Sequence, residues 1–160
     1  MVRIVIPLLC RSKKNGEQIA YNRKTGKSFI AQSKLYKKFE CDCGYFLKRY
    51  ARHIRTPINL KCTFIVPDRR KRDLTNLENA IQDILIKYGV IEDDNYNIVH
   101  SQDGSRIIYV KGVEEIIIEI TEVTNEEIQA CDIIRSQYNR GTGKQGTRKN
   151  TKKSATNTHW

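Results

Sequence analysis

One strongly amphipathic segment with stop signals at both ends constrains the fold of this chain most. Before it, residues 58–66 largely alternate between apolar and polar positions, as in a β-strand, and Pro67 ends that run. Asp73 and Gly89 then bracket a stretch whose apolar residues recur at helical spacing. That apolar stripe consists of Leu77, Ile81, Ile84, Leu85 and Tyr88. A strand followed by a one-sided helix predicts a sheet with helices packed against it.

Further strand-like segments extend this sheet. The opening residues are β-branched and apolar and read as a strand, either central in the sheet or, because of Pro7, at its edge. Three more segments read as strands: residues 96–101, 107–110 and 115–123. Asp103-Gly104 predicts a hairpin turn between the first two of these.

Two further helices and another hairpin complete the pattern. A Thr-Gly turn signal at 25–26 predicts a hairpin after a basic loop. Ser33 precedes a stretch, residues 35–50, with helical spacing of apolar side chains. Thr124 and Glu127 fit a capping box at the start of a short last helix. The predicted fold class is α+β: a single domain with a mixed β-sheet packed by two or three helices.

We divide the chain into one domain, residues 1–138, and a disordered basic tail, residues 139–160. With 160 residues, 39% of them hydrophobic, the chain is long enough for one core but short for two. The tail has no acidic residue and almost no apolar ones. It therefore cannot bury enough surface to offset the entropy of ordering.

The balance of charges indicates a polyanionic partner. The formal net charge is +11, from 29 Lys and Arg against 18 Asp and Glu. Such a field attracts phosphate backbones, so that nucleic acid is the expected partner. Two other interpretations remain open at this point: the excess serves solubility, or it belongs to the tail alone.

Other features of the chain narrow the compartment and the chemistry. No apolar run reaches the roughly 18 residues of a membrane span, and the start lacks the marks of a signal peptide, so that we expect a cytoplasmic protein without a membrane partner. Five cysteines at irregular spacing indicate reduced thiols. A structural zinc site is disfavoured because Cys41 and Cys43 form the only close pair.

Cationic and acidic side chains come together in sequence around the amphipathic segment. A basic run ends the strand, Asp73 stands at the mouth of the helix, and an acidic cluster, residues 92–94, lies just beyond the helix. Metal-assisted phosphodiester cleavage needs hard oxygen ligands for Mg²⁺ beside cations that seat DNA. A surface that only bound DNA would gain nothing from carboxylates, because they repel phosphate. The candidate metal ligands are Asp73, Asp83, Asp93 and Asp94, and the candidate DNA contacts are Lys13, Lys14, Arg69, Arg70, Lys71 and Arg72.

The helix also carries a polar stripe, and a purely structural interpretation is open beside the chemical one. Asn76, Asn79 and Asp83 stand at i, i+3 and i+7, where the amides could hold a water or a phosphate oxygen. Yet Thr75 and Glu78 also fit a capping box, and Asp73 suits a helix start without any catalytic role. The acidic cluster could likewise be a solvated turn.

The same block resembles the signature of RusA-type Holliday-junction resolvases, a family of crossover junction endodeoxyribonucleases often found in phage and prophage genomes. In that signature a strand ends in Pro-Asp-Arg-Arg, Arg-Asp-Leu-x-Asn-Leu opens a helix that contains an Asp, and a Gly and an Asp-Asp pair follow. The matching residues are Pro67 to Arg70, Arg72 to Leu77, Asp83, Gly89 and Asp93-Asp94. The resemblance extends more weakly over residues 1–123.

The resemblance implies a Mg²⁺-dependent endonuclease that nicks four-way DNA junctions symmetrically in recombination or repair. Asp73 and Asp94 would hold the metal, and Asn76 would orient the site. Enzymes of this kind act as homodimers, because two symmetric nicks across a two-fold junction need two active sites related by the same symmetry.

This sequence departs from the family pattern at two positions. The third aspartate of the family falls on Thr75, and the family's helix lysine falls on Asn79. Thr75 supplies no negative charge, so that metal affinity is expected to be lower unless Asp83 or Asp93 joins the site.

Two other functions remain open from the sequence. A non-catalytic branched-DNA-binding protein would explain Thr75 as the change that removed activity. An RNA-binding module of ribosomal type would fit the size and charge, but it lacks the aromatic-rich strand signature of the common RNA-binding fold and leaves the acidic pair unexplained.

Overall fold

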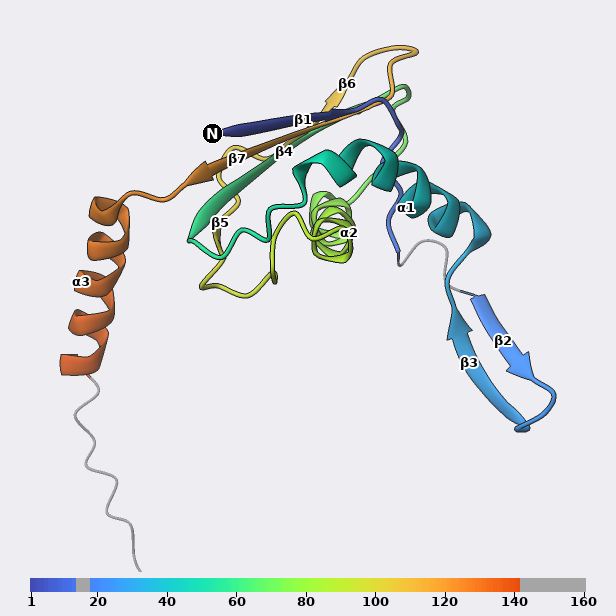
Figure 1. Ribbon diagram of the computed structural model, residues 1–160, viewed down its shortest axis with the longest axis horizontal. Helices are drawn as coiled ribbons and strands as arrows, with labels where there is room; N and C mark the ends of the chain where they lie inside the picture. Colours follow the sequence, from blue (N-terminus) through green and yellow to red (C-terminus); the bar gives the residue numbers. More distant parts are fainter. Residues whose placement is uncertain (14–17, 142–160) are drawn as a thin grey trace, which may run out of the picture. The chain divides into compact units, whose positions relative to one another are not determined.

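The computed structural model describes residues 1–13 and 18–141 of the chain. They form two compact units, Met1–Val123 and a second that begins at Thr124. The first unit contains a five-stranded mixed sheet with helices packed on it, so that the predicted α+β class is confirmed (Figure 1). The strands of this sheet are β1 (Val2–Ile6), β4 (Ile58–Val66), β5 (Val99–Ser101), β6 (Arg106–Tyr109) and β7 (Glu115–Glu122).

The first strand lies at an edge of the sheet, and β4 lies in its middle. β7 pairs antiparallel with both β1 and β4, whereas β5 and β6 pair parallel with β4. Of the two positions open to the first strand from the sequence, the structure therefore shows the edge position. Pro7 follows β1 directly, and a residue without a backbone N–H is tolerated there because the edge needs no further ladder bond.

The Asp103-Gly104 turn does not form the hairpin that the sequence suggested. β5 pairs with the start of β4 and β6 with its last four residues, and both run parallel to it. The turn therefore lies between two strands, β5 and β6, that both pair with β4. The side chain of Asn59 accepts hydrogen bonds from the Asp103 backbone N–H at 2.8 Å and the Ser101 hydroxyl at 2.9 Å, which holds the turn against β4. The strand predicted from Tyr96 begins only at Val99.

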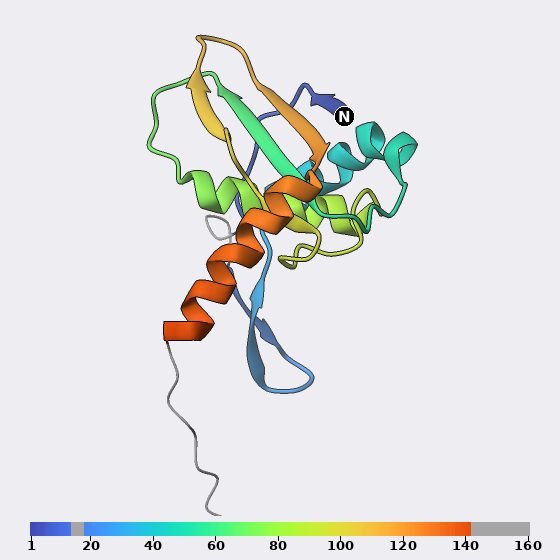
Figure 2. The same ribbon diagram turned by 90° about the vertical axis from the view of Figure 1, so that its left-hand side faces the viewer.

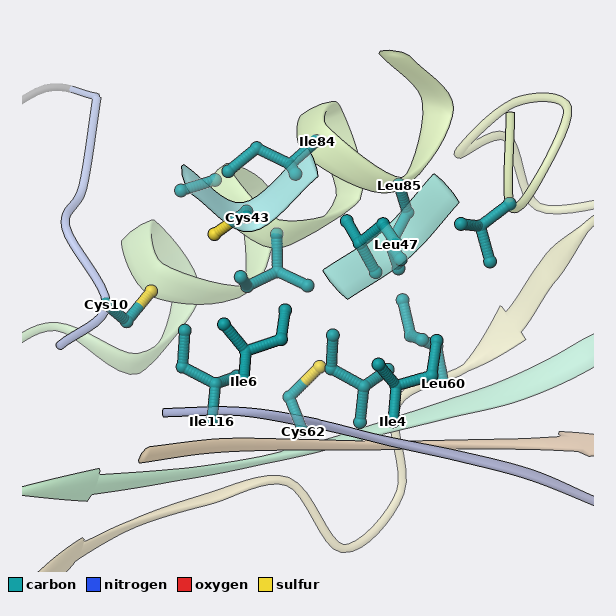
Figure 3. Packing of buried hydrophobic residues seen from close by; sticks show 14 of the residues in the cluster. Ile4, Ile6, Cys10, Cys43, Leu47, Leu60, Cys62, Ile84, Leu85 and Ile116 are labelled. Atoms are coloured by element: carbon teal, nitrogen blue, oxygen red, sulfur yellow. The ribbon is translucent and has the colours of Figure 1, made fainter. Parts of the chain in front are cut away.

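Two helices cover one face of the sheet. They are α1 (Lys34–Leu47), which continues into a short 3₁₀ helix, η2 (Lys48–Tyr50), and α2 (Leu74–Lys87). In Figure 3 the labelled side chains of both helices point at those of the sheet, with Cys43, Leu47, Ile84 and Leu85 above Ile4, Ile6, Leu60 and Cys62. Burial of an aliphatic side chain of this size stabilises a fold by about 1.5–3 kcal/mol. This layer therefore fixes where the ends of α2 lie.

α1 begins and packs as its sequence dictates. Ser33 caps it, since the Ser33 hydroxyl accepts a hydrogen bond from the Tyr36 backbone N–H at 3.1 Å. Gly44 lies in the helix interior, where glycine normally costs stability. A Cβ at this position would overlap the ring of Tyr88, just beyond α2. Gly44 is therefore needed for the close approach of the two helices.

A separate two-stranded ribbon precedes α1. Its strands, β2 (Gln18–Asn22) and β3 (Lys27–Ala31), pair antiparallel, which confirms the predicted hairpin. Figures 1 and 2 both show this ribbon extending away from the sheet and its helices.

The second unit begins with α3 (Asn125–Gly141). The predicted capping box is confirmed. The Glu127 carboxylate accepts from the Thr124 N–H at 2.8 Å, and the Thr124 hydroxyl accepts from the Glu127 N–H at 3.3 Å. The helix is longer than the sequence suggested and continues past the predicted domain end at residue 138. Most of the predicted tail, residues 142–160, lies outside the described residues. None of the helices in the described ranges has the length and apolarity to cross a bilayer.

Candidate functional site

Three strands of the sheet, β1, β4 and β6, finish at the same end of the sheet. β1 and β4 both run antiparallel to β7, and β6 runs parallel to β4, so that these three strands share one direction. Ile6 and Phe64 both pair with Ile116, and Ile107 pairs with Phe64, which places the strand ends level with one another. We call this end of the sheet, where the carboxyl ends of β1, β4 and β6 lie, the carboxyl edge. It is formed by the segments that follow the three strands: residues 7–13, 67–73 and 110–113.

The carboxyl edge carries four of the predicted phosphate contacts, Arg69 to Arg72. The segment after β1 carries Lys13, and the segment after β4 carries Arg69, Arg70, Lys71 and Arg72. Lys14 lies outside the described residues. The end of β4 thus places a run of four cations at this side of the sheet. A surface of this kind attracts phosphate groups.

The four residues of the basic run, Arg69 to Arg72, differ in their contacts and exposure. Arg72 has only 14% of its side chain exposed, because its guanidinium donates to the Asp68 carboxylate at 2.9 Å and to the Arg70 backbone carbonyl at 3.1 Å. Arg70 has 86% of its side chain exposed. The Arg69 guanidinium lies 5.1 Å from the centre of the Tyr109 ring, within cation–π range. Arg72 thus braces the segment, whereas its neighbours face solvent.

Asp68 is the partner that makes this bracing possible. The hydrogen bond from the Arg72 side chain, together with one from the Arg70 backbone N–H at 2.9 Å, lowers the pKa of the Asp68 carboxyl below its ordinary value. Asp68 therefore stays ionised and engaged with arginine at neutral pH. The Asp68 carboxylate is thus occupied by hydrogen bonds within the turn, unlike the exposed carboxylate of Asp73.

Asp73 stands at the start of α2 with its carboxylate in solvent. One of its oxygens accepts from the Asn76 backbone N–H at 3.3 Å and the other from the Asn76 side-chain amide at 3.0 Å. Asp73 is therefore the N-cap of the helix, as the structural interpretation predicted. A carboxylate has about four acceptor positions, so that this exposed group retains capacity for a further ligand.

Glu78 does not form the alternative capping box with Thr75. Its side chain is buried, and the Gln102 amide donates to its two carboxylate oxygens at 3.0 and 3.2 Å in the amide orientation that satisfies both ends of the group. The same amide accepts from the buried Gln82. No pattern in the sequence indicated this polar contact, which ties α2 to the turn between β5 and β6.

Asp83, a predicted metal ligand, is paired with a predicted DNA contact. The Lys13 ammonium lies 3.0 Å from the Asp83 carboxylate, and both side chains are partly exposed. Asp83 is ten residues beyond Asp73, which corresponds to about 15 Å along a helix. The pair links the segment after β1 to the middle of α2, and it removes both groups from the immediate surroundings of Asp73.

The acidic cluster lies at the other end of α2. The Glu92 N–H donates to the Ile54 carbonyl at 3.1 Å, and its carboxylate pairs with Arg55. Residues 54 and 55 lie just before β4 begins, so that the cluster is at the edge opposite to the carboxyl edge. In Figure 2 the green segment between β4 and α2 lies at one end of α2, and the yellow-green segment that follows α2 lies at the other.

Within the acidic cluster, Asp93 and Asp94 differ in their surroundings. Asp93 accepts from the Asn95 side-chain amide at 2.7 Å and from the Asp94 backbone N–H at 2.8 Å. These hydrogen bonds lower the pKa of the Asp93 carboxyl. Asp93 thus stabilises its own turn, and both Asp93 and Asp94 are exposed.

The distance between the two predicted principal ligands follows from α2 itself. The helix has 14 residues, which span about 21 Å at the usual rise. A magnesium ion binds its ligands at about 2.0–2.1 Å, so that Asp73 and Asp94 of one chain do not reach a common ion. Across residues 1–13 and 18–141, no group of three His, Cys, Asp or Glu side chains is placed to hold a metal.

The comparisons with known proteins point to one family. No protein-family model matches the chain. A crossover junction endodeoxyribonuclease RusA from Aquifex aeolicus is 39% identical over 64 residues, which are 39% of this chain and 48% of that protein. The matched part thus spans about half the length of this curated relative. The RusA-type resemblance predicted from the sequence is confirmed over this part of the chain.

Proposed function

We propose that the chain is an endodeoxyribonuclease that nicks four-way DNA junctions symmetrically, with Mg²⁺ as its cofactor, in DNA recombination or repair. The similarity to a crossover junction endodeoxyribonuclease supports this class of substrate. The observation that carries the proposal is the exposed Asp73 carboxylate at a cationic edge. Arg69, Arg70 and Lys71 precede it closely and face solvent.

This arrangement suits cleavage better than binding alone. The cations attract the DNA backbone and bring its phosphates to the carboxyl edge. A carboxylate at the same place opposes that attraction unless a divalent cation lies between it and the phosphate. Asn76 keeps the Asp73 side chain in one orientation through two hydrogen bonds. Asp73 would therefore be a metal ligand, with Asn76 as its positioning residue.

The donors suit Mg²⁺ in kind, although one chain supplies too few of them at one place. Carboxylate oxygens are the ligands that Mg²⁺ prefers, usually one or two together with waters. When bound, the ion would stabilise negative charge on the scissile phosphate and make an attacking water more acidic. One chain offers Asp73 at one end of α2 and Asp94 at the other.

A two-fold dimer resolves this separation. If Asp94 of a second copy lies beside Asp73 of the first, symmetry places Asp94 of the first copy beside Asp73 of the second. Each dimer then has two complete sites and no site within a single chain. Two sites related by a two-fold axis are also what symmetric nicking of a four-way junction requires. We therefore propose a homodimer with shared sites.

The first test uses a synthetic four-way junction with Mg²⁺. Asp73→Asn and Asp94→Asn are each expected to abolish nicking and to leave junction binding in EDTA nearly unchanged. Asp132→Asn, which changes an exposed carboxylate on α3, is the matched control and is expected to nick like the parent. Nicking by both site variants at the parental rate would refute these roles.

A non-catalytic branched-DNA-binding protein is a second candidate, favoured by one observation. Thr75 is exposed in the first turn of α2, where the resemblance places a third aspartate. Without that carboxylate the shared site has two acidic ligands. Such a protein would bind junctions equally well in EDTA and Mg²⁺ and would not nick them. Thr75→Asp would then be expected to create Mg²⁺-dependent nicking, whereas a nuclease would nick without it.

A further inference from the structure

The β2–β3 ribbon belongs to the first unit, and the proposed site does not use it. Its turn is well defined: the Asn22 side chain accepts from the Lys24 N–H at 2.9 Å and the Thr25 N–H at 3.3 Å, and Gly26 adopts a φ of +68°. The left-handed conformation at Gly26 suits a residue without a Cβ. The sequence therefore specifies a tight ribbon and not a loose loop.

Large aromatic side chains are exposed on this ribbon. Tyr21 is 64% exposed and Phe29 is 50% exposed. Tyr21 pairs with Ser28, and Phe29 pairs with Ala20. Because neighbouring positions along a strand alternate between faces, the two rings lie on opposite faces of the ribbon. The residue that pairs with each ring across the ribbon, Ser28 or Ala20, is small and leaves the ring accessible to solvent.

The ribbon is also strongly cationic. From residue 18 to residue 39, which covers the ribbon and the start of α1, the sequence has no Asp or Glu. The same stretch contains six basic residues: Arg23, Lys24, Lys27, Lys34, Lys37 and Lys38. Three of them belong to the turn or border it. Single exposed apolar residues are common on protein surfaces, but open rings between cations form the combination that binds single-stranded nucleic acid.

We propose that the ribbon contacts the branch point of the DNA junction, where Tyr21 and Phe29 stack on unpaired bases while the turn cations contact the adjoining phosphates. This rests on the proposed function, since that supplies the branched DNA. In a continuous duplex both faces of each base are covered by its neighbours. At a branch point a base can leave its stack and present a face to an aromatic ring. The ribbon would then recognise the branch, and the carboxyl edge would place the backbone for cleavage.

The test compares binding to a four-way junction and to a duplex of the same sequence, in EDTA so that no cutting occurs. Tyr21→Ala with Phe29→Ala is expected to weaken junction binding by at least about thirtyfold, because two rings are lost and each stacking contact contributes roughly 1–3 kcal/mol. Duplex binding depends on phosphate contacts and is expected to change by less than about twofold. Tyr45→Ala removes an exposed ring from α1 and serves as the matched control.

Replacing the turn cations tests the second half of the proposal. Arg23→Gln with Lys24→Gln and Lys27→Gln is expected to weaken junction and duplex binding alike and to reduce the salt slope by about 0.9 per lost phosphate contact. Tyr21→Phe keeps the ring and is expected to bind the junction like the parent. Thermal unfolding of each variant shows whether the fold is intact.

Two results would overturn the inference. One is unchanged junction binding after loss of both rings. The other is an equal loss on junction and duplex, which would indicate insertion of the ribbon into a groove of paired DNA. Failure of the proposed function is a separate outcome, because it appears as absence of nicking in Mg²⁺ while these binding measurements, made in EDTA, remain informative.

Discussion

The proposed shared site predicts that two inactive variants restore each other when mixed. Asp73→Asn and Asp94→Asn each damage both sites of a homodimer. In a mixed dimer the two lesions fall together: one site carries Asn at both positions, and the other retains Asp73 from one copy and Asp94 from the other. The reason is the length of α2. Its ends are about 21 Å apart at the usual helical rise, which prevents either chain from completing a site alone.

The expected size of the recovery follows from symmetry. Equal amounts of two freely exchanging variants give mixed dimers as about half of all dimers, and each has one intact site of two. About one quarter of the parental number of sites is therefore recovered. The products should also change in kind, because a mixed dimer nicks one strand of the junction and cannot make the paired cut.

The assay is nicking of a junction extruded from a supercoiled plasmid, where one nick gives a relaxed circle and paired nicks give a linear molecule. The variants are mixed, allowed to exchange and compared with each variant alone. Relaxed circles without linear product are expected. The control mixture combines Asp73→Asn with the double variant Asp73→Asn, Asp94→Asn, which has no intact site in any pairing and is expected to stay inactive.

A mixture that stays inactive, although exchange of subunits is demonstrated, would refute the shared site. In that case each carboxylate would act only together with the other carboxylate of its own chain. Recovery in the control mixture would equally contradict the reasoning, because it would show residual activity in a variant assumed to be inactive.

Three further predictions follow from the fold. Gly44→Ala is expected to lower the free energy of unfolding in urea by about 1–3 kcal/mol, because the new methyl group would meet the Tyr88 ring. Adding Tyr88→Ala to the same chain should recover part of this loss. If the losses of the two single variants simply add in the double variant, the contact is contradicted. Asp68→Asn is expected to lower the melting temperature at neutral pH but not in acid. The lowered pKa of Asp68 means that its contribution is complete above its ordinary pKa of 3.8 and is lost as the pH falls through the folded value. A maleimide is expected to label two of the five cysteines rapidly, the exposed ones on α1 and α3, since burial raises the pKa of the other three thiols.

Local signals in the sequence were sufficient for the parts of the fold that depend on neighbouring residues. Asp73 and Gly89 bracket α2 as expected. Gly89 has a left-handed φ of +66°, which is the conformation that commonly ends such a helix. The capping box of Thr124 and Glu127 is present for the same reason, since its two hydrogen bonds join residues three positions apart. Features of this kind need no knowledge of the rest of the chain.

Features that depend on distant partners were not predictable in the same way. The β5–β6 turn looks like a hairpin, but Asn59 and the free side of β4 decide its conformation. One local contact was also missed: Arg72 looks like its neighbours in the basic run, and no pattern showed that Asp68, four residues before it, would hold its side chain inward. The run of four basic residues therefore contains one arginine with a structural role, Arg72, and three exposed basic residues.

The candidate site shows the same limit most clearly. Asp73 and Asp94 belong to one block of sequence, and that closeness suggested that they meet. The element between them is a helix of 14 residues. Such a helix is rigid, so it holds its two ends about 21 Å apart. Under the proposed function, the sequence block therefore encodes two half-sites at opposite ends of one helix. In the proposed homodimer a second copy, turned about a two-fold axis, brings the unlike ends together. The spacing that separates the two carboxylates in one chain would then give two equivalent sites in the pair.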